Sequence, residues 1–480
     1  MSFVSWPFAL FLPVVFALHY LGRSQGWQVG VLTLSSFLFY GWSHPRLIPL
    51  LAIACWVNSA ASWALFRSGR TDRQRRTVLL WALVFNLGTL GFFKYSALIG
   101  RLILPDALWS LIGPWLSSIP LPVGISFFTF QGISLVVDAW HAGSRGIPGL
   151  PGEDAGGRVG RHYGNVTFFK AFFPQLVAGP IVKAGEFFHQ IGPKRLTRIP
   201  WDASVKTLIL GFFLKMVVAD NLKEVTAAIR YPEFLELPSI NLAALVYAFS
   251  FQLLADFAGY SLIAIGLARL FGYELPANFN HPYLSRSITE FWRRWHMTLS
   301  SWLREYLYIP LGGNRRGEWR TYRNLFLVMF LGGLWHGAAW SYAVWGMAHG
   351  VLLALERLTG RHRVTESRPW SLLSILQAFL CFTAVTFLWL LFQLPEFGQV
   401  VLYLRTLATQ GGPPQVQALY VIACFSLPVV LWHLWGATEP WRRTWSRQTA
   451  DRVTVVLHGA MLFLILTNAG PPGEFIYFQF

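Results

Sequence analysis

The sequence carries little charge for its length. Of its 480 residues, only 13% are charged, whereas an average soluble domain has roughly 25%. A soluble enzyme of this size would need more polar surface, and a disordered chain would not be 54% hydrophobic. The 3 cysteines lie far apart within apolar runs, which excludes a disulfide-rich secreted scaffold.

Several catalytic motifs are also missing. The chain contains no phosphate-binding P-loop, no G-x-S-x-G elbow, no H-E-x-x-H and no paired Cys-x-x-Cys. These absences argue against nucleotide hydrolysis, serine-hydrolase chemistry and a zinc site, so we expect no metal centre. The first 22 residues lack Lys and Arg. Because a cleaved signal peptide begins with a basic region, we expect a first transmembrane helix here instead.

The sequence contains many long apolar runs, and a helix of about 20 consecutive apolar residues is long enough to cross the hydrocarbon core of a bilayer. The runs predict spans near residues 5–22, 27–43, 46–66, 77–100, 121–140, 203–228, 240–270, 371–394, 416–436 and 453–469. We therefore expect an all-α integral membrane protein with about 10–12 transmembrane helices. Two further apolar regions, 168–188 and 325–355, are interrupted by glycine or proline. They predict re-entrant or half-length helices, which often mark a functional centre.

Basic residues cluster in short connectors between the apolar runs. The 39 Lys and Arg exceed the 22 Asp and Glu, which gives a net charge of +17. Because cytoplasmic loops are enriched in Lys and Arg, we place these connectors in the cytoplasm, and the acidic loop 231–241 and the N-terminus outside. One such connector contains Arg357, Arg361, Arg363 and Arg368. Because the arginines are spread over separate loops and do not form one continuous basic surface, we expect no nucleic-acid partner.

Residues 285–311 predict an amphipathic helix at the cytoplasmic membrane surface. Its aromatic face contains Trp292, Trp295, Leu299 and Trp302, and its polar face contains Arg293, Arg294 and Arg304. Glu290, four residues before Arg294, is placed for a helix-supporting ion pair. The arginines either anchor the helix on anionic lipid or line the mouth of a pocket for a phosphate-bearing ligand. His296 lies in this segment, where a structural hydrogen bond is the simpler interpretation.

His336 is a stronger candidate for chemistry. From Leu325 to Ala348, Tyr342 is the only other ionisable side chain, and an ionisable residue at membrane depth is costly to keep. A neutral imidazole in an apolar site can act as a general base near pH 7. We therefore predict a catalytic role for His336 and a structural role for His349 in the same region.

Several stretches together resemble the membrane-bound O-acyltransferase family, most closely its bacterial alginate O-acetyltransferase branch. The similarity covers nearly the whole chain. It is carried by LPVGISFFTFQGISLVVDAW (121–140), FFPQLVAGPIVKAGEF (172–187), GFFLKMVVADNL (211–222), the RWH motif ending at His296, the WHG motif containing His336, and the terminal FIYFQF (475–480). The resemblance implies N-terminal helices over 1–120, a catalytic core with a tunnel over 121–360 and C-terminal helices over 361–480.

The resemblance also implies roles for residues and ligands. His336 matches the histidine regarded as catalytic in the family, and His296 matches one thought to assist. Acetyl-coenzyme A is the expected acetyl donor, with no permanently bound cofactor, and its phosphates would meet Arg293, Arg294, Arg315 or Arg316. Periplasmic acetyltransferase or relay proteins and membrane lipids are the expected partners, and the bacterial inner membrane is the expected location.

Three functions remain open at this point. The first is O-acetylation of a secreted exopolysaccharide such as alginate or cellulose. The second is D-alanyl transfer to teichoic acid from a carrier-protein thioester, because that branch shares the same motifs. The third is a non-catalytic transporter for an acyl group or lipid, which would also use re-entrant segments and a histidine at membrane depth.

Overall fold

The computed structural model describes residues 1–42, 44–360, 370–473 and 475. The predicted cytoplasmic arginines Arg361, Arg363 and Arg368 and the terminal residues 476–480 lie outside the described residues, as does the end of the span expected at 27–43. The chain forms two compact units. The first comprises Met1–Val205 with Ile263–Pro276, and the second comprises Lys206–Leu262 with Ala277–Phe480.

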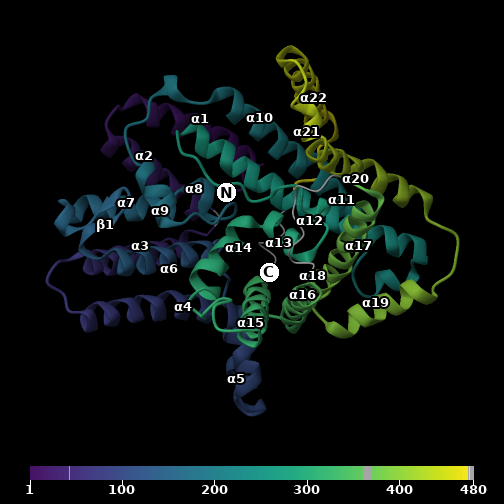
Figure 1. Cartoon of the computed structure of the whole chain (residues 1–480), viewed down its shortest axis with the longest axis horizontal. Helices are drawn as coiled ribbons and strands as arrows, with labels where there is room; N and C mark the ends of the chain where they lie inside the picture. The colour runs from purple at the N-terminus through teal and green to yellow at the C-terminus, as the bar shows by residue number, and fades with distance from the viewer. Residues whose placement is uncertain (43, 361–369, 474, 476–480) are drawn as a thin grey trace. The chain divides into compact units, whose positions relative to one another are not determined.

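The first unit is built mainly from the N-terminal helices. Its elements are α1 (Trp6–Leu21), α2 (Gln25–Gly41), α3 (Ile48–Phe66), α4 (Asp72–Ile103), α5 (Asp106–Ser118), α6 (Ile125–Ala142), β1 (Gly146–Ile147), β2 (Leu150–Pro151), α7 (Val159–Ala171), α8 (Phe173–Leu176) and α9 (Ala184–Phe187). Helices α3, α4 and α6 pack side by side, and α7 packs on α2 and α3 (Figure 1). The two strands pair antiparallel, with Gly146 opposite Pro151.

The second unit contains most of the remaining helices. Helix α10 (Trp201–Phe212) begins in the first unit and ends in the second, where the π-helical segment η6 (Phe213–Ala219) and α11 (Asp220–Thr226) follow it. Helix α12 (Ser239–Leu270) begins in the second unit and ends in the first. The others are α13 (Ile288–Arg294), α14 (Met297–Leu303), the π-helical segment η9 (Arg304–Tyr308), α15 (Glu318–His336), α16 (Trp340–Leu358), α17 (Leu372–Leu388), α18 (Leu390–Gln393), α19 (Phe397–Thr409), α20 (Val416–Ala437), α21 (Glu439–Arg442) and α22 (Arg447–Asn468).

The predicted fold class is confirmed, because the regular secondary structure of the described residues is almost entirely helix and each of the ten predicted spans coincides with helix. Six segments of the described residues are long and apolar enough to cross a membrane. They are Pro45–Phe66, Asp72–Ile103, Ser239–Leu270, Leu372–Gln393, Val416–Ala437 and Arg447–Asn468. Side-chain caps fix where such helices begin. At α4, for example, Thr71 and Gln74 form a reciprocal capping box.

The apolar region 325–355 folds into a helical hairpin of α15 and α16, which are 19 residues each. Glycines allow the two backbones to approach closely. A Cβ on Gly333 would lie 2.3 Å from the carbonyl oxygen of Tyr342, and one on Gly346 would lie 2.2 Å from that of Met329. Because contacts this short are not tolerated, only glycine permits this packing. The hairpin places His336 at the C-terminal end of α15, directly before the turn.

The continuous helix predicted over 285–311 is wrong. The structure has α13 and α14 separated at Trp295 and His296, and His296 adopts the left-handed conformation with φ 42° and ψ 53°. The backbone N–H of Met297 donates to the carbonyl oxygen of Asn278, 2.9 Å away, instead of to a preceding turn of helix. Of the residues predicted on its aromatic face, Trp295, Leu299 and Trp302 are buried in the protein.

Candidate active site

His296 is fully buried and is held from one side by the segment that precedes α13. Its Nδ1 lies 2.9 Å from Oδ1 of Asn278, and the same oxygen accepts a hydrogen bond of 2.9 Å from the Thr298 hydroxyl. Nδ2 of Asn278 donates to the Ser261 hydroxyl oxygen over 3.1 Å. A left-handed, non-glycine backbone costs of the order of 1–3 kcal/mol, so these contacts also offset strain at His296.

This arrangement determines which ring nitrogen of His296 carries the proton. An amide oxygen only accepts hydrogen bonds, so Nδ1 must donate to Asn278. In a neutral ring, Nε2 is then the acceptor, and no hydrogen-bond partner for it occurs in the described part of the chain. Burial lowers the pKa of His296, which lies outside the predicted spans, to about 3. His296 therefore presents a neutral, unprotonated Nε2 within the protein at physiological pH.

His336 is 4% exposed and lies among aromatic rings. Its ring centroid is 4.7 Å from that of Trp335, 5.3 Å from Trp345 and 4.9 Å from Phe392. The Trp335 ring also lies 6.2 Å from His296. The two predicted histidines therefore flank one indole. We call the rings of His296, His336, Trp335, Trp345 and Phe392 the histidine–aromatic centre.

His349 supports the centre from α16. It accepts a hydrogen bond through Nδ1 from the indole N–H of Trp292 over 3.3 Å, and its ring lies 4.7 Å from that of Trp345. This bond attaches α13 to α16, which is the structural role predicted for His349. Trp292 thus contributes to packing within the protein.

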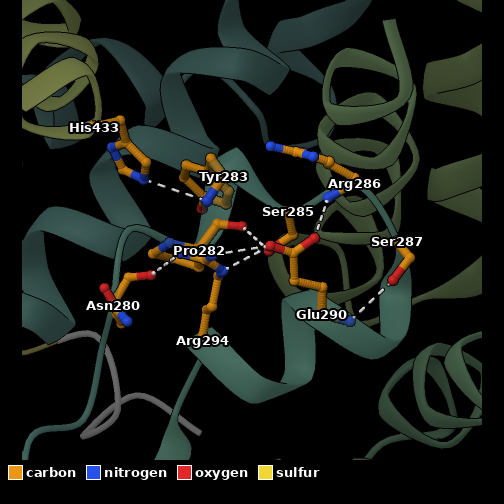
Figure 2. A network of polar contacts seen from close by, with 9 residues as sticks. All are labelled: Asn280, Pro282, Tyr283, Ser285, Arg286, Ser287, Glu290, Arg294 and His433. Carbon is orange, nitrogen blue, oxygen red and sulfur yellow. Dashed lines mark hydrogen bonds and ion pairs between the residues drawn. The ribbon is translucent and has the colours of Figure 1, made fainter. Parts of the chain in front are cut away.

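The four arginines predicted to meet the donor lie in different environments. Arg294 forms an ion pair with Glu290 at 2.9 Å, which confirms the predicted i, i+4 pair, and it also donates to the carbonyl oxygen of Asn280 over 3.3 Å. Figure 2 shows this network, in which Glu290 additionally accepts from the backbone N–H of Arg286. The side chains of the other three arginines are exposed to solvent: Arg293, Arg315 and Arg316. Arg294 is therefore already engaged in fixing the loop before α13.

Comparison with known proteins shows which family this chain belongs to. The model of the membrane-bound O-acyltransferase family (MBOAT) matches residues 162–371, which contain both histidines. The "Probable alginate O-acetylase AlgI" of Pseudomonas aeruginosa is 37% identical over 369 residues, or 75% of this chain and 67% of that protein. The peptidoglycan O-acetyltransferase of Helicobacter pylori is 33% identical over 395 residues, or 79% of this chain and 74% of that protein. The chain belongs to the membrane-bound O-acyltransferase family.

Membership in the MBOAT family makes the chain an O-acyltransferase and an integral membrane protein. The interpretation as a non-catalytic transporter is therefore set aside. A less similar relative is the teichoic acid D-alanyltransferase of Bacillus subtilis. It is 28% identical over 270 residues, or 52% of this chain and 63% of that protein.

Sequence reasoning missed a buried charge cluster in this acyltransferase. Nζ of Lys215 lies 2.7 Å from Asp220 and 2.8 Å from Asp256, and it donates to the carbonyl oxygen of Gly473 over 3.1 Å. Asp256 directly precedes Phe257, whose ring is 4.7 Å from that of His296. The cluster lines a cavity of about 190 Å³. A lysine five residues before an aspartate within the apolar run 203–228 was the available signal.

Proposed function

We propose that this acyltransferase takes an acetyl group from a cytoplasmic thioester and passes it outward across the inner membrane for O-acetylation of a secreted exopolysaccharide. The observation that carries the proposal is the histidine–aromatic centre, in which His296 and His336 flank the indole of Trp335. A buried site with two imidazoles suits transfer to a hydroxyl group, because burial limits the access of water, which would otherwise compete as the acceptor.

In the proposed reaction, His336 acts as the general base. It takes the proton from an acceptor hydroxyl while the hydroxyl oxygen forms a bond to the thioester carbonyl carbon. The carbon–sulfur bond then breaks, and the proton passes to the departing thiolate, which leaves as a thiol. General-base catalysis of this kind contributes roughly 10²–10⁴-fold, and holding both substrates in one site adds proximity.

His296 assists through Nε2, the buried ring nitrogen that has no hydrogen-bond partner among the described residues. Because Nδ1 donates to Asn278, only Nε2 can accept a proton or a hydrogen bond from a substrate group or from a proton path leading to His336. Asn278 is a positioning residue in this scheme, since it acts on the reaction through His296. The left-handed backbone at His296 directs the ring differently from its helical neighbours.

Acetyl-coenzyme A is the proposed donor. Arg293, Arg315 and Arg316 are exposed and lie in the basic segment 286–323, which we expect on the cytoplasmic side from its charge. Guanidinium groups bind phosphates through paired hydrogen bonds. The internal ion pair of Arg294 with Glu290 makes Arg294 less available for this contact. Periplasmic acetyltransferase or relay proteins are the proposed partners that receive the acetyl group.

The names of the relatives guide the choice of acceptor. The acetylating relatives match 75–79% of this chain, whereas the D-alanylating relative matches 52%, and this favours acetyl over D-alanyl transfer. Among acetyl acceptors, we prefer an exopolysaccharide, because the alginate O-acetylase of Pseudomonas aeruginosa is 37% identical to this chain and the peptidoglycan O-acetyltransferase of Helicobacter pylori is 33% identical.

Mass spectrometry of cell-surface polymers tests the proposed acceptor. We compare cells that have the protein, cells that lack it, and cells that carry His336→Ala at the same protein level. The expected result is an acetylated exopolysaccharide in the first cells alone. Acetyl loss confined to peptidoglycan, or loss of D-alanine from teichoic acid, would contradict the proposed acceptor, and unchanged polymers in the His336→Ala cells would contradict the role of His336.

A further inference from the structure

The first unit has a groove between α2 and α7. Its volume is about 750 Å³. The wall from α2 includes Gly26, Gly30, Leu34 and Phe37, and the wall from α7 includes Arg161 and Gly164. The α2 residues follow one another at intervals of three or four, so they share one face of the helix. A Cβ added at Gly26, Gly30 or Gly164 would meet nothing within 4 Å, so no neighbouring atom fills the groove at these positions.

The length of the groove matches one leaflet of a bilayer. From Gly26 to Phe37 the helix rises by roughly 16 Å at 1.5 Å per residue. The hydrocarbon core of a bilayer is about 30 Å thick, so the groove spans about half of it. Arg23 lies just before α2, and the segment between α6 and α7 contains Arg145 and Arg158. Both place the Gly26 end of the groove at the cytoplasmic surface.

A polar cavity adjoins this cytoplasmic end. It measures about 120 Å³, shares Gln25, Arg161 and Asn165 with the groove, and adds Arg158. Both arginines are exposed, and neither forms an ion pair with any described residue. The nearby Glu153 carboxylate instead accepts hydrogen bonds from the backbone and hydroxyl of Ser68 at 2.7 and 2.9 Å. Two guanidinium groups that have no ion-pair partner among the described residues therefore lie beside the cytoplasmic end of a mainly apolar groove about as long as one leaflet.

We propose that the groove binds one phospholipid of the cytoplasmic leaflet with an anionic headgroup. Its phosphate contacts Arg158 and Arg161, and one acyl chain lies along α2 as far as Phe37. Charge-assisted hydrogen bonds from guanidinium to phosphate give the headgroup preference, and basic pockets between helices on the cytoplasmic side favour anionic headgroups. The site is separate from the proposed acyl-transfer reaction and does not depend on it.

Native mass spectrometry of the purified full chain tests this site. The protein is incubated with phosphatidylglycerol or with phosphatidylcholine of the same acyl chains, and the retained lipid is counted. Wild-type protein is expected to retain one phosphatidylglycerol in preference to phosphatidylcholine. The double variant Arg158→Gln/Arg161→Gln should retain about tenfold less phosphatidylglycerol. Gly30→Leu should lower the retention of both lipids, because its side chain fills the groove.

Matched variants separate this site from general effects of charge or bulk. Arg145→Gln removes a charge from the segment between α6 and α7, and Gly88→Leu adds bulk to α4, where a Cβ also meets nothing within 4 Å. Neither residue lines the groove or its polar end. Equal retention of the two lipids by wild-type protein would overturn the proposal. So would a double arginine variant that behaves like Arg145→Gln, or a Gly30→Leu variant that behaves like Gly88→Leu.

Discussion

Asn278 determines what His296 can do, through a single hydrogen bond of 2.9 Å to Nδ1. In Asn278→Ala, Nδ1–H loses its buried acceptor, which costs about 1–3 kcal/mol, and the ring is free to place its proton on Nε2. We expect acyl transfer to fall by about tenfold or more, with the protein still folded. Steady-state rates measured together with the thermal midpoint check this outcome.

Asn278→Asp separates the positioning role from simple packing. Wild-type His296, whose pKa burial lowers to about 3, stays neutral from pH 5 to 8 and adds no inflection to the pH–rate profile. A carboxylate beside Nδ1 stabilises the imidazolium and raises its pKa. Nε2 is then protonated below that pKa, so we expect activity to decline as the pH falls. Thr298→Val, which keeps the Asn278–His296 bond, should retain the wild-type profile, and the same profile in Asn278→Asp would contradict the assignment.

The α15–α16 hairpin depends on a close approach of two helices at Gly333 and Gly346. In Gly333→Ala, the new Cβ would lie 2.3 Å from the carbonyl oxygen of Tyr342, so the helices must separate, at a cost of about 1–3 kcal/mol. We expect a lower thermal midpoint and lower activity, because the shift moves His336. Gly88→Ala on α4 meets nothing within 4 Å, so it should be neutral or slightly stabilising. Equal effects of the two variants would show that the contact is unimportant.

The cluster of Lys215, Asp220 and Asp256 joins η6, α11 and α12 by buried charge. In Lys215→Met, two carboxylates remain buried without their ammonium partner, which typically costs about 3–5 kcal/mol. We expect a large loss of folded protein, measured by size-exclusion chromatography and thermal unfolding. Lys223→Met, which alters a less buried lysine of the same cavity, should be much milder. A Lys215→Met variant as stable as Lys223→Met would show that the cluster does not hold these elements together.

Across the whole molecule, the sequence predicted what depends on composition and period. Runs of about 20 apolar residues predicted the positions of the helices. The scarcity of ionisable residues around His336 predicted a catalytic role for it. The break at His296 could not be predicted, because the competing hydrogen bond comes from Asn278, which is distant in sequence. The pairing of Lys215 with Asp256 and the shared indole of Trp335 depend likewise on tertiary contacts. Local patterns do not encode which distant residues meet.

The most direct test of the proposed function uses purified protein in lipid vesicles with acetyl-coenzyme A labelled in the acetyl group. The release of coenzyme A and the transfer of label to a hydroxyl acceptor are measured for wild type, His336→Ala and the control His349→Gln, which keeps an acceptor for Trp292. We predict that transfer by His336→Ala is lower by at least about 10²-fold, whereas His349→Gln retains most of its activity. Transfer by His336→Ala at the wild-type rate would contradict the assignment of His336 as the general base.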